Sequence, residues 1–159
     1  MPKAFAACPT LVVDAPIGGV WNLLTDFEGW GSFYDVRVLK VEPTGPAIVG
    51  QSMFGESGPR WLHLGVSFEF LLIDVPNHKL EFSVQLPLGL TVHEMLDCVP
   101  LADERCRVNY HCNFGIPNGW RGAFIHVFLS RELVRGPEDS IQRLKRRAEE
   151  SYCNNAARP

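Results

Sequence analysis

The chain has 159 residues, a hydrophobic content of 46% and a formal net charge of −3 at pH 7. This length is typical of a single domain, and the apolar content is sufficient for a buried core. Because the net charge is small and no stretch is strongly basic, the composition argues against nucleic-acid binding. No run approaches the ~18 apolar residues of a membrane span, so integral membrane contact is not expected.

The N-terminus and the cysteines favour a cytoplasmic location. The first ten residues, MPKAFAACPT, lack the continuous apolar core of a signal peptide. The five cysteines are odd in number and show no CxxC spacing, which favours free thiols in a reducing compartment. We expect one domain over residues 1–159, with a frayed tail at 154–159. We expect no metal and no other cofactor.

The first part of the chain predicts a strand followed by two short helices. Residues 3–13 form the strand, and Pro9 interrupts it, which favours an edge position or a bulge. Pro16 suits the first position of a helix, and Thr25 or Asp26 would cap the second one. The expected buried residues of these helices are Val20, Trp21, Leu23, Leu24, Phe27 and Trp30.

From residue 35 onward the apolar residues alternate, which is typical of half-buried strands. We expect strands over residues 36–41, 49–55, 60–75, 78–86, 90–100 and 104–114. The inward side chains of the two longest alternating runs are predicted to be Leu62, Leu64, Val66, Phe68, Phe70, Leu72, Leu80, Phe82, Val84 and Leu86.

The last two strands form a hairpin whose register is predicted from charge and polarity. Pairing Asp97 with Arg107 places Cys98 opposite Cys106 and Leu96 opposite Val108. One face then becomes nearly all apolar, and it includes Glu94 and Tyr110, while the other face is mostly polar. The same register places His93 opposite His111. A one-residue slip would mix apolar and polar side chains on both faces.

Residues 120–150 show the only long helical periodicity. Apolar side chains recur there at steps of three and four residues, and charged side chains occupy the opposite face. Gly136-Pro137 predicts a break and a new helix start, because proline suits a first helical position. The first half would then gate a cavity, and the second half would pack on the sheet. The predicted stripe consists of Ala123, Val127, Ser130, Val134, Pro137, Ile141, Leu144 and Ala148.

These elements predict an α+β fold. A curved antiparallel sheet of about six to seven strands wraps around a long C-terminal helix, and two short helices follow the first strand. An antiparallel sheet needs a cover on its apolar face, and the amphipathic helix can supply it. Where the inner side chains do not fill the space between sheet and helix, a ligand cavity is left.

Two segments resemble a known family. The run VWNLLTDFEGW at residues 20–30 and the closing run IQRLKRRAEES at residues 141–151 are similar to the polyketide cyclase/dehydrase and lipid-transport family of the START/Bet v 1-like superfamily. The resemblance spans nearly the whole chain and implies the helix-grip fold and a hydrophobic ligand. No catalytic set is carried over from that family to this sequence.

Glu94 is the residue that the pattern singles out for chemistry. An ionised carboxylate on an apolar face is costly unless it is paired, so it predicts a shifted pKa and an acid/base or anchoring role. The competing interpretation is a structural carboxylate satisfied by Tyr110 or by water. Arg60 begins the long strand and is expected to point to the same face as its inward apolar residues. There it would pair with Glu94 or bind a ligand oxygen. The competing interpretation is a solvated residue at the strand end.

The sequence supplies many candidate cavity-lining side chains. The predicted set is Trp30, Phe54, Phe68, Phe70, Phe82, Leu96, Phe114, Phe124, His126 and Phe128. Aromatic walls suit a flat ligand, although the same residues would also make an ordinary core. His93 and His111 lack a third ligand for a metal, and the inward cysteines are expected to be inert thiols.

Three functions remain open from the sequence. The leading one is an enzyme that cyclises or dehydrates a polyketide-like or aromatic molecule by positioning and acid/base chemistry. The second is a carrier or sensor of a lipid, quinone or similar ligand, with no chemistry. The third is a dimerising module that uses the exposed face of the sheet.

Overall fold

The structure is a computed structural model, and it describes residues 5–58, 63–128 and 130–157. Within these residues, eight strands form one antiparallel sheet in the order β1-β8-β7-β6-β5-β4-β3, and β2 also pairs with β8. The strands are β1 (Phe5–Ala7), β2 (Thr10–Val13), β3 (Arg37–Glu42), β4 (Ser52–Ser57), β5 (Leu64–Asp74), β6 (Lys79–Gln85), β7 (Thr91–Ala102) and β8 (Arg105–Gly115).

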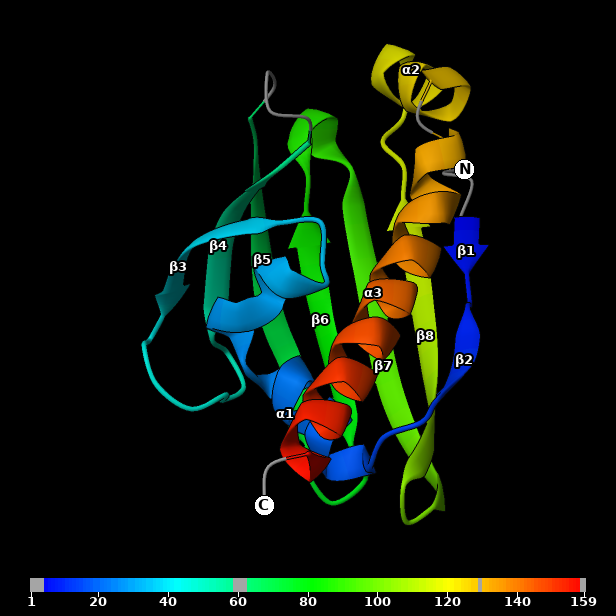
Figure 1. The fold of residues 1–159 in the computed structure, drawn as a ribbon. Helices are drawn as coiled ribbons and strands as arrows, with labels where there is room; N and C mark the ends of the chain where they lie inside the picture. Colours follow the sequence, from blue (N-terminus) through cyan, green and yellow to red (C-terminus); the bar gives the residue numbers. More distant parts are fainter. Residues whose placement is uncertain (1–4, 59–62, 129, 158–159) are drawn as a thin grey trace.

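Helices cover one face of this curved sheet. Over that face lie α1 (Ile17–Thr25), the 3-10 turn η1 (Phe27–Ser32) and α3 (Ser130–Ala156). The 3-10 turn η2 (Pro87–Gly89) and α2 (Trp120–Phe128) lie at one end of the molecule. Figure 1 shows α3 running across the sheet, with α1 near its C-terminal end and α2 at the opposite end of the molecule. The expected α+β fold, with a long C-terminal helix gripped by an antiparallel sheet, is confirmed. Among the described residues, no helix is long and apolar enough to cross a membrane.

The first predicted strand is divided at Pro9. Its two parts both pair with β8, and the Pro9 carbonyl still accepts a hydrogen bond from the backbone N–H of Tyr110 at 2.9 Å. Proline cannot donate to the ladder, so the strand breaks there while its carbonyl stays paired. This division accounts for one of the strands beyond the expected six to seven.

The predicted hairpin register is wrong by two residues. In the structure Leu96 lies opposite Tyr110 and Asp97 lies opposite Asn109, whose side-chain amide donates to the Asp97 carboxylate at 2.7 Å. An amide hydrogen bond therefore replaces the expected Asp97–Arg107 charge pair. Because side chains alternate with a period of two, a two-residue shift leaves every side chain on its predicted face. Glu94 and Tyr110 consequently still point to the core side.

The predicted alternation of the long strand fails at its end. The register of β5 against β6 shifts between Phe70 and Leu72, so Leu72 is 38% exposed and Ile73 lies opposite the buried Leu80. A bulge inserts one residue and reverses the parity beyond it. The strand expected at 49–55 begins later, at Ser52, because Gly50 adopts a positive φ of 83° in the preceding turn.

The predicted break at Gly136-Pro137 is also wrong. The helix α3 begins at Ser130 and runs through Pro137, so no new helix starts there. Pro137 is buried on the side that faces the sheet, and this packing offsets the hydrogen bond that proline cannot donate. The helix continues to Ala156, so residues 154–156, which were expected to belong to a frayed tail, are helical.

The apolar stripe of the C-terminal region is correct only in its second half. Ile141, Leu144 and Ala148 are buried against the sheet, whereas Val127 is 70% exposed and Val134 is 37% exposed. The predicted stripe therefore fails in α2, where Ile125 is the buried one among the described side chains.

Candidate functional site

The turn η1 packs on the sheet and positions one of the side chains of the site. The Asp26 carboxylate caps it as predicted, accepting from the backbone N–H of Gly29 at 3.3 Å. The buried Trp30 side chain donates to the Leu24 carbonyl at 3.1 Å, and its ring contacts Phe68, Phe70 and Phe82. These contacts fix the turn against the sheet.

Tyr34 follows directly from this turn. Its backbone N–H donates to the Trp30 carbonyl at 2.8 Å, and the two rings stack with centroids 5.4 Å apart. The ring of Tyr34 also meets Phe68 edge to face. The side chain is thereby directed across the sheet toward β7, although it lies far from β7 in the sequence.

Glu94 on β7 is the centre of the site. It is 3% exposed, and each carboxylate oxygen accepts a hydrogen bond from a different tyrosine. The Tyr34 hydroxyl donates to Oε1 at 2.8 Å, and the Tyr110 hydroxyl donates to Oε2. We call this group the Glu94–tyrosine cluster. Tyr110 was expected beside Glu94, whereas Tyr34 was not.

Burial and hydrogen bonding act on the Glu94 pKa in opposite directions. Desolvation raises the pKa from 4.5 to about 7, and the bonds from Tyr110 and Tyr34 limit the rise by stabilising the ionised form. Burial, and then the nearby Glu94 charge, raise the pKa of both tyrosines well above 10. At neutral pH Glu94 can therefore either hold or release a proton, while both phenols remain protonated donors.

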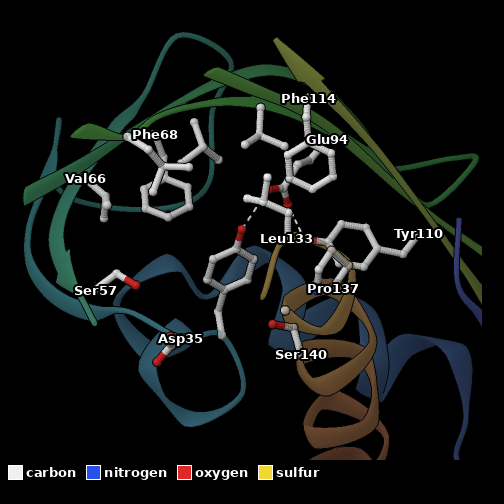
Figure 2. Close-up of a pocket in the computed structure, with 15 residues that line it drawn as sticks. Asp35, Ser57, Val66, Phe68, Glu94, Tyr110, Phe114, Leu133, Pro137 and Ser140 are labelled. Atoms are coloured by element: carbon white, nitrogen blue, oxygen red, sulfur yellow. Dashed lines mark hydrogen bonds between the residues drawn. The ribbon is translucent and has the colours of Figure 1, made fainter. Parts of the chain in front are cut away.

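A cavity of ≈170 Å³ lies between the sheet and α3, with the Glu94–tyrosine cluster in its wall. Figure 2 shows Glu94, Tyr110 and Phe114 on the sheet side and Pro137 and Ser140 on the helix side. Asp35 and Ser57 lie at the other margin. The lining residues are Tyr34, Asp35, Ser57, Val66, Phe68, Val84, Leu86, Val92, Glu94, Tyr110, Phe114, Leu133, Gly136, Pro137 and Ser140.

The predicted cavity-lining residues that lie before the C-terminal helices divide into three groups. Phe68 and Phe114 line the cavity. Trp30, Phe70, Phe82 and Leu96 are buried in the core and do not line it. Phe54 is 40% exposed on the outer face of the sheet, so its assignment to the cavity is wrong. On β4 the buried, inward residues are Met53 and Gly55, so Phe54 between them points to the outer face.

The predicted gate on the first half of the C-terminal region is wrong. Phe124 is 44% exposed and His126 is exposed on α2, and neither lines the cavity. The side chain of Phe128 and all of Arg60 lie outside the described residues. The helical wall of the cavity comes from α3 instead, through Leu133, Gly136, Pro137 and Ser140.

His93 and His111 are not opposed as predicted. With the corrected register, His93 lies opposite Asn113, and His111 lies opposite Met95. His93 pairs with Glu81 at 2.7 Å on the outer face of the sheet. Within the described part of the chain, no three His, Cys, Asp or Glu side chains gather in a metal-binding arrangement.

The inward cysteines are poor nucleophiles. Cys98, Cys106 and Cys112 are buried free thiols, and burial raises the pKa of each, that of Cys98 to about 12. A thiol with so high a pKa is not ionised at neutral pH, so it supplies no thiolate. Cys8 and Cys153 are exposed free thiols and lie away from the cavity lining.

Sequence reasoning did not identify Tyr34, Asp35, Ser57, Leu133 and Ser140 as members of the site. The first two follow a 3-10 turn, where neither strand nor helix periodicity assigns a direction to a side chain. A signal for Ser140 does exist, because it lies one turn from Leu144 and Pro137 on the apolar stripe, where a small polar side chain is unusual.

An antiparallel sheet that grips a long helix over a partly apolar cavity defines a helix-grip protein. The chain belongs to the family described as polyketide cyclase/dehydrase and lipid transport, whose model matches residues 10–149. This confirms the resemblance inferred from the two sequence segments. No curated protein sequence matches the chain significantly.

Solved structures with the same fold include enzymes and a Bet v 1-like protein. Norcoclaurine synthase from Thalictrum flavum, in complex with dopamine and hydroxybenzaldehyde, has a TM-score of 0.64 at 15% identity, covering 94% of this chain and 88% of that one. Ara h 8.0201 has a TM-score of 0.71 at 12% identity, with coverages of 96% and 99%. The Zhui aromatase/cyclase from a Streptomyces species has a TM-score of 0.66 at 17% identity, with coverages of 98% and 95%. These identities are low, so the comparison establishes the fold.

Proposed function

We propose that the protein binds a small aromatic or polyketide-like carbonyl compound in the cavity and cyclises or dehydrates it, with Glu94 as the acid/base. Family membership supports a hydrophobic ligand, and the fold shared with an aromatase/cyclase is compatible with this chemistry. The observation that carries the proposal is Glu94 itself. It is a buried carboxyl group in the cavity wall with a pKa of about 7, which suits proton transfer at neutral pH.

The Glu94–tyrosine cluster can move one proton and stabilise the charge that results. Aldol cyclisation and dehydration of a hydroxyketone both begin with removal of a proton from the carbon beside a carbonyl group. The C–H bond breaks, its proton goes to Glu94, and the electron pair moves to the carbonyl oxygen. Once Glu94 is neutral it is a weaker acceptor, so the Tyr34 and Tyr110 hydroxyls can donate to the developing oxygen anion instead.

Phe68 and Phe114 are suited to hold the flat part of the ligand, and α3 forms the opposite wall. The cavity wall therefore supplies positioning as well as the acid/base group.

The experiment uses 2-indanone, a compact aromatic ketone, as the probe. In heavy water, NMR follows the exchange of its acidic protons for deuterium, which reports the first proton transfer directly. We expect the wild type to accelerate exchange over buffer, and Glu94→Gln to lower that rate by about a hundredfold or more. Glu69→Gln is the matched control, because Glu69 is an exposed glutamate on the outer face of β5.

Binding is measured separately from exchange by the shift in melting temperature on adding 2-indanone. If the wild type binds the ketone but does not accelerate exchange, the acid/base role of Glu94 is rejected and the carrier or sensor function is favoured. If Glu94→Gln exchanges as fast as the wild type, another group is the base. If an aromatic ketone does not bind at all, the proposed ligand class is wrong.

A further inference from the structure

The helix α2 exposes its apolar face and buries the opposite one. Ile125 is fully buried and Gly122 is buried, and a Cβ at Gly122 would lie 2.0 Å from the Pro117 carbonyl oxygen. That side of the helix therefore packs directly on the preceding segment. Trp120 is 72% exposed and Val127 is 70% exposed on the other side.

Trp120, Phe124 and Val127 are spaced by four and three residues, so they lie on one face of the helix. Phe124 is 44% exposed. We call these three side chains the α2 apolar face. An amphipathic helix ordinarily turns such a stripe toward the core. A contiguous apolar face turned outward, at one end of the molecule, is a feature of interaction sites (Figure 1).

The chain segment that carries this face is positively charged. Residues 116–135 contain Arg121, Arg131 and Arg135 against the single acid Glu132, a net charge of 3 − 1 = +2, whereas the whole chain carries −3. All three arginines are exposed. The Arg121 guanidinium carbon lies 5.7 Å from the Trp120 ring centroid, so a cation accompanies the most exposed aromatic side chain.

We propose that α2 docks the protein on the surface of an anionic phospholipid bilayer. An exposed tryptophan with arginines beside it matches the interface between acyl chains and headgroups, where indole rings and cationic side chains are enriched. A nine-residue helix can lie in that interface without crossing the bilayer. A second copy of the chain is a poorer partner, because a symmetric contact would bring the two positive faces together.

The test measures cosedimentation of the full chain with phosphatidylcholine vesicles, with and without phosphatidylglycerol. We expect binding to the anionic vesicles to be at least about tenfold tighter than to the neutral ones, and to weaken as salt screens the arginines. The double variant Trp120→Ser, Val127→Ser should lower binding to anionic vesicles by about tenfold or more. Both side chains are exposed, so circular dichroism should be unchanged.

Matched variants separate this face from general surface properties. Leu39→Ser, Val75→Ser removes apolar side chains of 57% and 56% exposure elsewhere on the surface and should bind like the wild type. Arg121→Gln, Arg131→Gln, Arg135→Gln should lose binding, whereas Arg143→Gln, Arg146→Gln, Arg147→Gln, in the C-terminal half of α3, should retain it. The proposal is overturned if vesicles do not bind, or if both sets of variants behave alike. It is also overturned if light scattering finds a dimer that Trp120→Ser, Val127→Ser dissociates, because the face would then be occupied by a second copy.

Discussion

Glu94 combines two properties that ordinarily exclude each other in a glutamate: it is nearly inaccessible to water, and the described groups that bind its carboxylate are two hydroxyls and no cation. Two phenol hydroxyls take the place of the missing solvent. Their hydrogen bonds offset part of the desolvation cost of the ionised carboxylate. The remaining cost leaves the Glu94 pKa close to neutrality. A stronger partner, such as an arginine, would have fixed the group as a permanent anion.

This balance has a consequence for stability. In the unfolded chain the Glu94 pKa is near 4.5, and in the folded chain it is about 7. Between these values the folded protein keeps a proton that the unfolded chain has lost, so the free energy of unfolding falls as the pH rises through this window and levels off above it. The full effect is about 3 kcal/mol.

The measurement compares urea unfolding of the wild type and of Glu94→Gln across the window from pH 4.5 to 7. Glutamine does not ionise, so the variant should gain about 3 kcal/mol relative to the wild type as the pH rises. The difference between the two proteins isolates Glu94 from all other titrating groups. A difference that stays constant with pH would show that the folded and unfolded pKa values are alike.

At the level of elements, α3 has two roles along its length. Its first turns, with Leu133, Gly136 and Pro137, form the wall of the cavity, whereas Ile141, Leu144 and Ala148 anchor it to the sheet. Its C-terminal half is tied further by Lys145, which donates to the Val12 carbonyl at 2.9 Å. The helix is therefore held most firmly where it does not touch the ligand cavity.

This division predicts unequal costs for two similar substitutions. Leu144→Ala should lower the free energy of unfolding by about 2–5 kcal/mol, because the side chain is fully buried. Val134→Ala should cost less than about 1 kcal/mol, because Val134 is 37% exposed. Urea denaturation of both variants checks the phase of the helix. Comparable losses would instead support the continuous stripe that periodicity alone predicts.

The strands and helices were predicted from the sequence better than the turns and pairing registers that connect them. Parity along β7 and β8 placed Glu94 and Tyr110 on the inner face even though the register was two residues out, because parity survives an even shift. Tyr34 was missed because its direction depends on a 3-10 turn that no periodicity describes. The cavity wall was assigned to the wrong residues of the C-terminal region, because Gly136-Pro137 is a strong local breaker that tertiary packing overrides.

At the scale of the whole molecule, the space between sheet and helix limits the ligand. The cavity of ≈170 Å³ is close to the volume, about 150 Å³, that holds a benzene-sized molecule. Sites for drug-sized ligands are typically about 300–1,000 Å³. A one-ring or compact two-ring ligand therefore fits the cavity at this volume, whereas a larger one requires the first turns of α3 to move outward.

Ligand size should accordingly divide probes into two kinetic classes. We expect 2-indanone to associate in a single fast phase in stopped-flow fluorescence. A tetracyclic aromatic ketone should associate more slowly, at a rate that becomes independent of its concentration when the opening of α3 limits binding. Fast, single-phase binding of the tetracyclic probe would mean that the cavity is already wide enough in solution.

The outer strand β3 bears on whether the protein aggregates at high concentration. It ends the sheet, so its unpaired backbone groups form an edge that another copy could extend. The pairing register of β3 with β4 shifts between Val38 and Lys40, and the charged side chains of Arg37, Lys40 and Glu42 are exposed on the strand. An uneven, charged margin offers a poor template for regular strand addition. Concentrated samples should therefore resist fibril growth through this edge, and fibrils, where they form, should begin from unfolded chains.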